Sequence, residues 1–433
     1  MTIYEIIESV ATIGSTKAKQ EILEANKSNE VLKNCFFYAE NPRVNFFIRM
    51  GESREVVAPS HGRDLSMADF LLLDRLIKRD VTGNDARQWV GNIMEPLNNG
   101  AREILCRIID RDLRCGAGTS ISNKVWKNLI PEYPVMLASK FDAKAEKYLS
   151  QFENKAGFVV QKKCDGGRVN IKVGANGVVT YYSRAGNELN LFGVFDYQFS
   201  RFTDTVFDGE LLVRSKTGVE ARTVGNGLYT KAVRNTLTQQ EAQRFSIEIW
   251  DVIPILEFNN GIGNVPYRER LARLDQMKFD ENVTVVESKQ VRTLAECVEF
   301  YEEMRARGEE GAIIKVAGAV WEDARSKSMV KMKAICDVDA LCIGVEPGTG
   351  KYAGMIGNLI CQDSTGALLF NVGTGLTDAD RTKDASAYVG KIVECVYNEI
   401  ISAKNKSTKS LFLPVFKQVR MDKKIANSLC ELK

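Results

Sequence analysis

The run Lys163-Cys164-Asp165-Gly166-Gly167-Arg168 places an amine, a carboxylate, two glycines and a fixed cation within six residues. A lysine amine is a poor nucleophile at neutral pH because its ordinary pKa is about 10.4. A nearby cation or the loss of solvent makes the neutral amine easier to form. Arg168 stays charged at any working pH, and a bound divalent metal would act in the same direction. Lys163 is therefore a candidate nucleophile, and either Arg168 or a bound metal could activate it.

The two glycines admit more than one explanation. Without a Cβ atom, the backbone of Gly166 and Gly167 can approach a bulky ligand or adopt positive φ. The same composition is typical of a polar β-turn with charged flanks, and the six residues alone support both interpretations equally. The rest of the chain has to decide between them.

Strand patterns lie on both sides of this motif. Phe158-Val159-Val160 is typical of a buried strand, and Val169, Ile171 and Val173 alternate with polar residues at a period of two. We therefore predict that the second run is the return strand of a β-hairpin. Lys163 would lie at the mouth of that hairpin, on rigid backbone.

Acidic residues occur within or beside other apolar strands. Asp208-Gly209-Glu210 interrupts the apolar run 206–212, and Glu310 precedes the apolar run 311–316. A carboxylate in such a place is costly unless it is paired or binds a metal or a hydroxyl. Each of these acids alone has an ordinary explanation, because acids at strand ends are common.

Cations follow the same pattern. At strand period two, the ammonium groups of Lys331 and Lys333 project from one face. Two like charges side by side repel, so the pair indicates a polyanion between them. Arg184 adds a further cation after a strand-like run.

Overall composition excludes several classes of protein. The chain of 433 residues is long enough for several domains. It has no apolar run of the ~18 residues that a membrane span needs, and its start lacks the pattern of a signal peptide. Ten cysteines without a CxxC pair favour reduced thiols. We therefore expect a cytoplasmic protein (host cytoplasm if the source is viral), with no membrane partner.

The single histidine, His61, makes histidine acid–base chemistry and a His-rich metal site poor candidates. A catalytic metal would then need carboxylate ligands, which suit Mg²⁺ or Mn²⁺.

Periodicity divides the chain into three parts. Residues 1–130 have helical apolar stripes, and one helix carries Arg107, Arg111 and Arg114 opposite its apolar face. Such arginines are most often solvated, but they could also bind phosphates. Residues 131–334 mix strands and helices, which predicts an α+β domain with a mixed or antiparallel sheet.

Residues 335–433 show short apolar runs split by glycine-rich turns, the pattern of a small all-β barrel such as the OB-fold. From Ser402 onward this part contains eight Lys or Arg against two acids. A basic tail is usually a solvated face, but it also suits binding to a phosphate backbone.

Seven short motifs occur in an order that resembles the ATP-dependent DNA ligases, within the covalent nucleotidyltransferases. They are Lys163–Arg168 (KxDGxR), Ser183–Gly186 (SRxG), Asp208–Glu210 (DGE), Trp250-Asp251 (aromatic-Asp), Glu310–Lys315 (EGxxxK), Lys331–Lys333 (KxK) and Arg420–Lys423 (RxDK). KxDGxR alone is moderately specific, whereas seven motifs in order are very specific. The segments 11–17, 111–114 and 411–414 also look like bacteriophage DNA ligases of the T-even type.

The resemblance implies a reaction and a role for each motif. Lys163 would attack the α-phosphate of ATP and become a lysyl-AMP, which passes AMP to the 5′-phosphate of a nick in duplex DNA. The adjacent 3′-hydroxyl would then seal the strand and release AMP. Such enzymes serve DNA replication, repair and recombination.

The implied site residues fall into four groups. Gln161 would read the adenine, Trp250 would stack on it, and Arg168 and Glu210 would contact ribose and phosphate. Phosphates would be held by Arg184, Arg325, Lys331 and Lys333. The Mg²⁺ ligands would be Glu210 and Glu310, with Mn²⁺ as a substitute. The C-terminal motif consists of Arg420, Asp422 and Lys423, and its cations Arg420 and Lys423 would contact pyrophosphate.

One segment departs from the family pattern. Many relatives have a basic residue shortly before the last motif's Phe, whereas Leu413-Pro414-Val415-Phe416 is apolar. The residues that meet pyrophosphate are therefore the least secure part of the resemblance.

Two alternatives stay open at this point. An RNA ligase shares the first five motifs but usually lacks both the helical front domain and the RxDK tail. A catalytically inactive nucleic-acid-binding relative would not need Lys163, Glu210, Glu310 and Lys331, which are all present. The favoured partner is nicked duplex DNA, bound by a monomer; the sequence indicates no partner protein.

Overall fold

A computed structural model describes the chain apart from residues 51–61, 216–217, 221, 334–335, 403–407 and 433. His61 and the tail lysines Lys404, Lys406 and Lys433 lie outside the described residues. The chain divides into the unit Pro131–Ala334 and a second unit of Met1–Ile130 with Ile335–Lys433. In the part of the chain that is described, no helix has the length and apolar character needed to cross a membrane.

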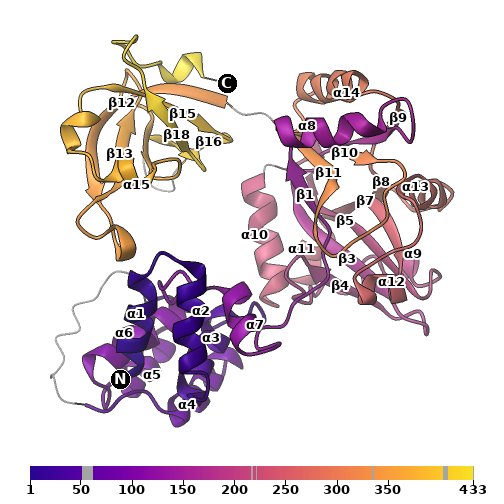
Figure 1. Ribbon diagram of the computed structural model, residues 1–433. Helices are drawn as coiled ribbons and strands as arrows, with labels where there is room; N and C mark the ends of the chain where they lie inside the picture. Colours follow the sequence, from indigo (N-terminus) through magenta and orange to yellow (C-terminus); the bar gives the residue numbers. More distant parts are fainter. Residues whose placement is uncertain (51–61, 216–217, 221, 334–335, 403–407, 433) are drawn as a thin grey trace. The chain divides into compact units, whose positions relative to one another are not determined.

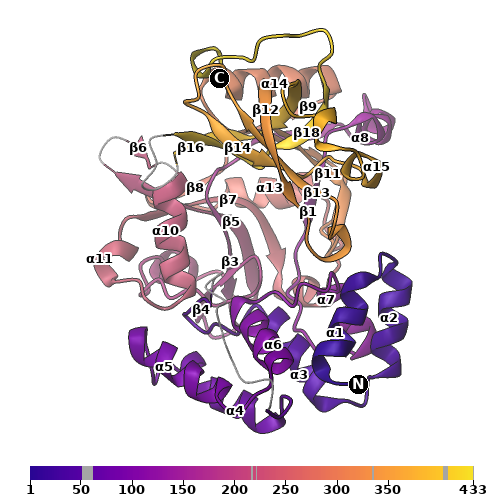
Figure 2. The same cartoon turned by 90° about the vertical axis from the view of Figure 1, so that its left-hand side faces the viewer.

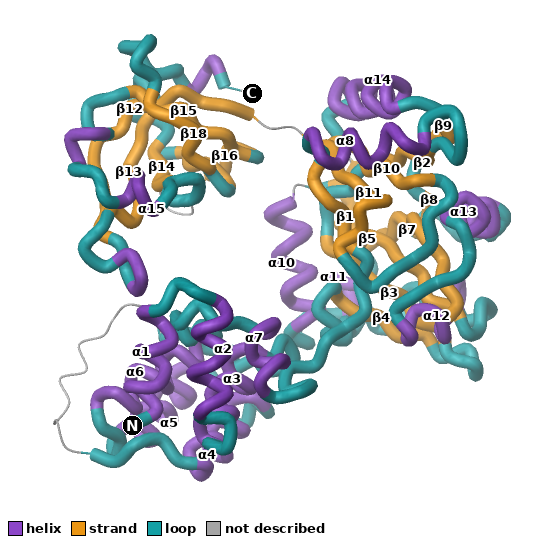
Figure 3. Tube along the Cα trace, viewed as in Figure 1, coloured by secondary structure: helices purple, strands orange, loops and turns teal. Residues whose placement is uncertain are grey.

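The N-terminal part is all-α, as predicted (Figure 3). Its helices are α1 (Ile3–Thr12), α2 (Thr16–Ala25), α3 (Glu30–Glu40), α4 (Met67–Ile77), α5 (Gly83–Met94), α6 (Asn99–Asp110) and α7 (Thr119–Val125). Their apolar stripes form one core, in which Ile7, Phe36 and Ile104 are fully buried. Helix α1 starts at a capping box between Thr2 and Glu5, which satisfies backbone donors at its N-terminus.

The unit Pro131–Ala334 is α+β and contains two mixed sheets (Figure 1). The first sheet has the order β1 (Leu137–Lys140), β11 (Arg325–Lys333), β10 (Gly311–Val316), β2 (Phe158–Lys162) and β9 (Ser288–Val291). Only the β1–β11 pairing in this sheet is parallel. The second sheet has the order β4 (Val179–Ser183), β3 (Gly167–Val173), β5 (Thr205–Ser215), β7 (Phe245–Pro254) and β8 (Val283–Val285), with β6 (Gly218–Val219) paired to β5.

Helices cover both sheets and bury their apolar faces. The helices of this unit are α8 (Ala143–Leu149), α9 (Asp196–Phe199), α10 (Arg222–Val233), α11 (Gln239–Ala242), α12 (Ile255–Asn260), α13 (Tyr267–Asp275) and α14 (Leu294–Ala306). Helix α14 packs on β10 and β2, whereas α10 and α13 pack on strands of the second sheet. Figure 2 shows β3, β5 and β7 side by side, with α10 to their left.

The predicted hairpin around the lysine motif is wrong. Strand β2, which leads to Lys163, pairs with β10 and β9, whereas the following strand, β3, pairs with β4 and β5. The motif Lys163–Arg168 therefore carries the chain from one sheet to the other. Alternation at period two indicates that a strand exists, but it does not say which strand is its partner.

The C-terminal part is all-β and antiparallel, as predicted. Its main sheet has the order β14 (Leu369–Val372), β13 (Ile356–Gln362), β12 (Cys336–Pro347), β15 (Ile392–Tyr397) and β18 (Val415–Val419). Strands β16 (Glu399–Ser402) and β17 (Lys409–Phe412) form a separate pair, and α15 (Asp378–Arg381) is a short helix. Val338, Leu359 and Val393 are fully buried in the core of this part.

Candidate active site

A cavity of about 440 Å³ is lined by residues from both sheets of the α+β unit. The predicted site residues on its wall are Gln161, Lys163, Arg168, Arg184, Glu210, Trp250 and Glu310. Two other cavities, of about 470 and 640 Å³, contain neither Lys163 nor the two acids. The chemistry of the lining, rather than size, therefore selects this cavity.

The backbone and the side chain of Lys163 are both bonded to residues at the start of β10. Its backbone N–H donates to the carbonyl of Gly311 at 3.0 Å. Its ammonium forms an ion pair with one carboxylate oxygen of Glu310, and the Lys333 ammonium lies 3.9 Å from the other oxygen. Glu310 therefore lies between two ammonium groups, and Lys163 points into the cavity.

Glu210 lies on the central strand β5. Its partner on β3 is Arg168, and its partner on β7 is Glu248. One of its oxygens accepts a hydrogen bond from the N–H of Gly166 at 3.0 Å. Burial raises the pKa of Glu210 to about 7, against the opposing effects of Lys163, that N–H and Arg168. The structure therefore holds a carboxylate whose negative charge is only partly compensated.

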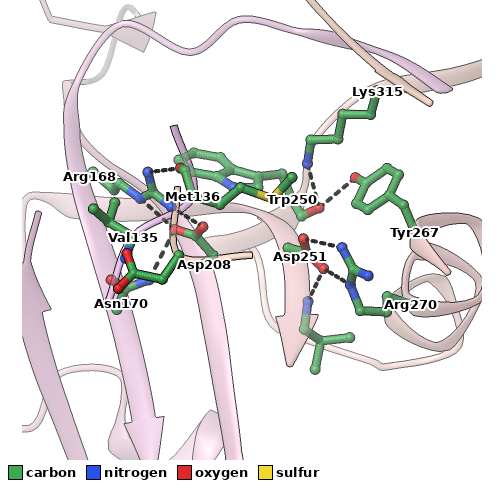
Figure 4. Close-up of polar contacts among 12 residues, drawn as sticks. Val135, Met136, Arg168, Asn170, Asp208, Trp250, Asp251, Tyr267, Arg270 and Lys315 are labelled. Carbon is green, nitrogen blue, oxygen red and sulfur yellow. Dashed lines mark hydrogen bonds and ion pairs between the residues drawn. The ribbon is translucent and has the colours of Figure 1, made fainter. Parts of the chain in front are cut away.

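Arg168 is held by the carboxylate of Asp208 and by the backbone carbonyl of Met136, a residue that also lines the cavity. Its Nε donates to one oxygen of Asp208 at 2.8 Å, its guanidinium also pairs with the other oxygen, and a third contact reaches the Met136 carbonyl at 2.7 Å (Figure 4). Asn170 donates to the same carboxylate at 3.0 Å. Asp208 thus orients the arginine, whose central carbon lies 5.8 Å from the ring centroid of Trp250.

Trp250 is the extra residue of a β-bulge. Along β7 the partner of Asp208 is Asp251 and the partner of Gly209 is Ile249, so Trp250 has no opposite residue. A bulge of this kind turns a side chain away from the regular alternation of the strand. It also releases the carbonyl of Trp250 from the ladder between the strands.

Two side chains that sequence reasoning gave no role satisfy this carbonyl. The Tyr267 hydroxyl donates to it at 2.6 Å and the Lys315 ammonium at 3.5 Å (Figure 4). Burial lowers the pKa of Lys315 to about 8, although Asp251 and Asp208 oppose the shift. The lysine inside the apolar strand 311–316 was the available signal, because a buried amine needs a partner.

The two glycines of the motif are required by packing within the protein. A Cβ atom on Gly167 would lie 2.2 Å from the ring of Tyr229, and one on Gly166 would lie 2.4 Å from the carbonyl oxygen of Leu211. The hydroxyl of Tyr229 also donates to the Arg168 carbonyl at 2.7 Å. Neither glycine has positive φ, so close approach is the reason for both.

The remaining predicted cations influence one another electrostatically. Burial and the charges of Lys333, Arg325 and Lys163 lower the pKa of Lys331. Partial desolvation and the charges of Arg168 and Arg325 likewise lower the pKa of Arg184, although much of this residue is exposed to solvent. Repulsion of this kind would be relieved by a polyanion, as the sequence pattern predicts.

The C-terminal motif forms a network inside the all-β part. Asp339, which is 3% exposed, pairs with Arg420 at 3.2 Å and also with Lys423. Arg420 pairs in addition with Asp422 at 2.7 Å, and this contact holds the pKa of the carboxyl at about 2. The three motif residues are thus brought together around one buried carboxylate.

The three arginines of the helical part have different environments. Arg107 is buried and pairs with Glu8 at 2.6 Å and Glu103 at 2.9 Å, so its guanidinium is engaged inside the helical part and is not presented to a phosphate as expected. Arg111 caps α6 in the left-handed conformation and donates to the Ala39 carbonyl at 3.0 Å. Arg114 is exposed. A helical stripe could not show which arginine had internal partners.

The carboxylates can be tested as ligands for a divalent metal. No group of three or more His, Cys, Asp or Glu in the described ranges has the geometry to hold a metal. Magnesium, however, is commonly bound by one or two carboxylates together with substrate phosphates and water. Glu210 and Glu310 line one cavity and supply two carboxylates, so the residues fit that kind of site.

Comparisons with known proteins point to one family. Residues 135–333 match the ATP dependent DNA ligase domain, and residues 347–420 match the DNA ligase OB-like domain, which confirms the OB assignment. The DNA ligase of Enterobacteria phage T4 is 31% identical over 478 residues, which cover 98% of this chain and 97% of the relative. The DNA ligase of phage T6 is 32% identical with the same coverage.

A solved structure agrees on the fold. The structure named Pmar-Lig_PreS3 superposes with a TM-score of 0.75 at 22% identity, covering 97% of this chain and 99% of that one. The expected activity, the sealing of nicks in duplex DNA at the expense of ATP, is confirmed, and neither the RNA ligase nor the inactive relative is favoured. By sequence, by fold and by the order of its motifs, this chain belongs to the ATP-dependent DNA ligases of the phage T4 type.

Proposed function

We propose that Lys163 is the residue on which this DNA ligase carries AMP. The observation that carries the proposal is its ammonium, which is held by Glu310 at the wall of a cavity that also contains Glu210 and Trp250. The neutral amine attacks the α-phosphorus of ATP. The bond from that phosphorus to the bridging oxygen breaks, and pyrophosphate leaves with the electron pair while the amine loses a proton.

The cavity residues bind and orient the nucleotide in this proposal. Trp250 offers its bulged ring to the adenine, and Gln161, which already donates to the Ser288 hydroxyl at 2.9 Å, reads the edge of the base. Arg168, fixed by Asp208, and Glu210 contact the ribose and phosphate side. Positioning of this kind provides much of the acceleration in phosphoryl and nucleotidyl transfer.

The cations of β11 bind the phosphates. The charges of Lys333 and Arg325 repel that of Lys331. A bound anion would relieve part of this electrostatic repulsion. Arg184 adds a fourth cation, and Arg420, Asp422 and Lys423 form the C-terminal motif proposed to meet pyrophosphate. Fixed cations stabilise the charge of a transition state much more strongly in a site that excludes water than they would in water.

We further propose that Glu210 and Glu310 hold Mg²⁺, with Mn²⁺ as a substitute. The metal, when bound, would neutralise charge that develops on the phosphates. The raised pKa of Glu210 supports this role, because a cation would stabilise its ionised form.

The later steps use the same cavity. The 5′-phosphate at the nick attacks the AMP phosphorus, the bond to Lys163 breaks, and the amine regains its proton. The 3′-hydroxyl then attacks the DNA phosphorus and gives its proton to solvent, while the bond from that phosphorus to AMP breaks and AMP leaves with the electron pair.

The helical part (residues 1–130) is proposed to bind the duplex, with Arg111 and Arg114 as phosphate contacts. We also propose that the protein acts as a monomer, in the host cytoplasm as expected of a phage DNA ligase. Light scattering with and without nicked DNA would test whether the protein is a monomer, and a stable dimer would contradict that proposal.

Covalent labelling tests the central proposal. Incubation with α-labelled ATP and Mg²⁺ should label the protein through an acid-labile bond, and Lys163→Ala should abolish the label. Lys155→Ala, which removes an exposed lysine elsewhere in the same unit, should label normally. If Lys163→Ala still takes up AMP, the assignment of the nucleophile is wrong.

A further inference from the structure

One buried carboxylate contacts both chain neighbours of Lys163. The ammonium of Lys162 lies 2.8 Å from Oε2 and 2.9 Å from Oε1 of Glu248. The Cys164 thiol donates to the same Oε2 at 3.1 Å. Neither Lys162 nor Cys164 is bonded to Glu310, which holds Lys163 itself. The side chains before and after the nucleophile therefore share one anchor, and the nucleophile has another.

The anchor joins two sheets at the point where the chain crosses between them. Lys162 is the last residue of β2 in the first sheet, and Glu248 is on β7 in the second sheet. No β-hairpin constrains Lys163, because β2 and β3 do not pair. The ion pair of Lys162 with Glu248 thus replaces the constraint that a hairpin would have provided.

Burial makes this anchor costly to break. Glu248 is 6% exposed, and removal of one partner of a buried ion pair leaves an uncompensated charge. Burial would lower the pKa of Lys162, but Glu248 outweighs it and raises that pKa. Lys162 is therefore held as the charged partner of Glu248.

We propose that Glu248 is a positioning residue for self-adenylation, acting through Lys162 and Cys164 to fix the backbone of Lys163. The inference rests on the proposed role of Lys163 as nucleophile. Glu248 is absent from the cavity lining, and its carboxylate bonds to Lys162 and Cys164 rather than to a side chain assigned to ATP. A displacement of about 1 Å at a reacting group can cost roughly a hundredfold in rate.

The test separates the step that uses Lys163 from the step that does not. Single-turnover formation of lysyl-AMP is measured at saturating ATP, together with the ATP dissociation constant. Sealing of a nick that already carries AMP on its 5′-phosphate is measured in the same preparations. Only the first reaction requires attack by the lysine amine.

For Glu248→Ala we expect lysyl-AMP formation to slow by about ten- to a hundredfold. ATP binding and the sealing of pre-adenylated nicks should change less than about threefold. Glu248→Gln, which keeps an acceptor for the thiol, should fall between Glu248→Ala and the wild type. Glu241→Gln, which alters a half-buried acid that is also paired with a lysine, Lys231, is the matched control and should behave as wild type.

A milder change keeps the test valid if Glu248→Ala does not fold. Cys164→Ala removes one contact to the anchor, whereas Cys164→Ser retains a donor. The alanine variant should form lysyl-AMP several-fold more slowly than the serine variant, with equal melting temperatures.

The proposal is overturned if Glu248→Ala and Cys164→Ala form lysyl-AMP at the wild-type rate. It is also overturned if sealing of pre-adenylated nicks falls in parallel, since that result shows general loss of structure. Failure of the underlying function looks different, because labelling would then persist in Lys163→Ala whatever residue stands at position 248.

Discussion

The ammonium of Lys163 pairs with the carboxylate of Glu310, a residue 147 positions further along the chain. Strand β10 makes this possible, because its first residue accepts the Lys163 N–H and its preceding residue supplies the carboxylate. The two motifs that contain these residues are therefore one local structure. This relationship leads directly to the first prediction.

Glu310→Ala should slow lysyl-AMP formation by about a hundredfold or more, because it removes the partner of Lys163 and a proposed metal ligand. The measurement is labelling by α-labelled ATP over a series of Mg²⁺ concentrations. Glu309→Ala is the matched control, since Glu309 lies 3.9 Å from Lys162 and does not line the cavity. Unchanged metal-dependent labelling in Glu310→Ala would rule out its proposed role.

Trp250→Ala should weaken ATP binding by roughly five- to a hundredfold, because stacking on an aromatic ring is worth about 1–3 kcal/mol per base. Trp250→Phe keeps a flat ring at the bulge and should lose much less. Equilibrium binding of ATP to both variants provides the comparison. Equal affinities in the two variants would mean that the ring does not stack on the base.

Lys315→Met should change the pH dependence of stability. The pKa of Lys315 is about 8 in the fold and near 10.5 in the unfolded chain, so between these values the unfolded state binds more protons. The wild type should therefore gain stability relative to Lys315→Met as pH rises from 8 to 10.5. The gain is at most about 3 kcal/mol, because one pKa unit corresponds to about 1.4 kcal/mol.

Thermal unfolding of both proteins across this pH range measures the effect. Other groups titrate there as well, but their contribution cancels in the difference between the two proteins. A difference in melting temperature that does not vary with pH would show that Lys315 has the same pKa in the folded and unfolded states.

We expect Arg114→Ala to affect DNA binding and Arg107→Ala to affect stability. Arg114 is exposed, so its loss should weaken binding to nicked duplex and reduce the salt dependence of binding by about one unit. Arg107 holds Glu8 and Glu103, so its loss should lower the melting temperature instead. Binding titrations at several salt concentrations and thermal unfolding distinguish the two, and a purely structural defect in Arg114→Ala would contradict its proposed role.

The sequence by itself predicted a set of residues for the chemistry and determined what class of fold carries them. Strands such as 169–173 and 311–316 lie where alternation and apolar runs predicted them. Local patterns suffice for this, because a strand's period and the desolvation cost of a buried charge are properties of short segments.

The tertiary structure decided how those residues are held. The partner of strand β2, the bulge at Trp250 and the internal pairing of Arg107 depend on segments far apart in the chain. The motif alone does not show why position 167 must be glycine. The structure shows that the ring of Tyr229 leaves no room for a Cβ atom. Long-range contacts of this kind leave no periodic trace in a single sequence, because either partner alone is compatible with many neighbours.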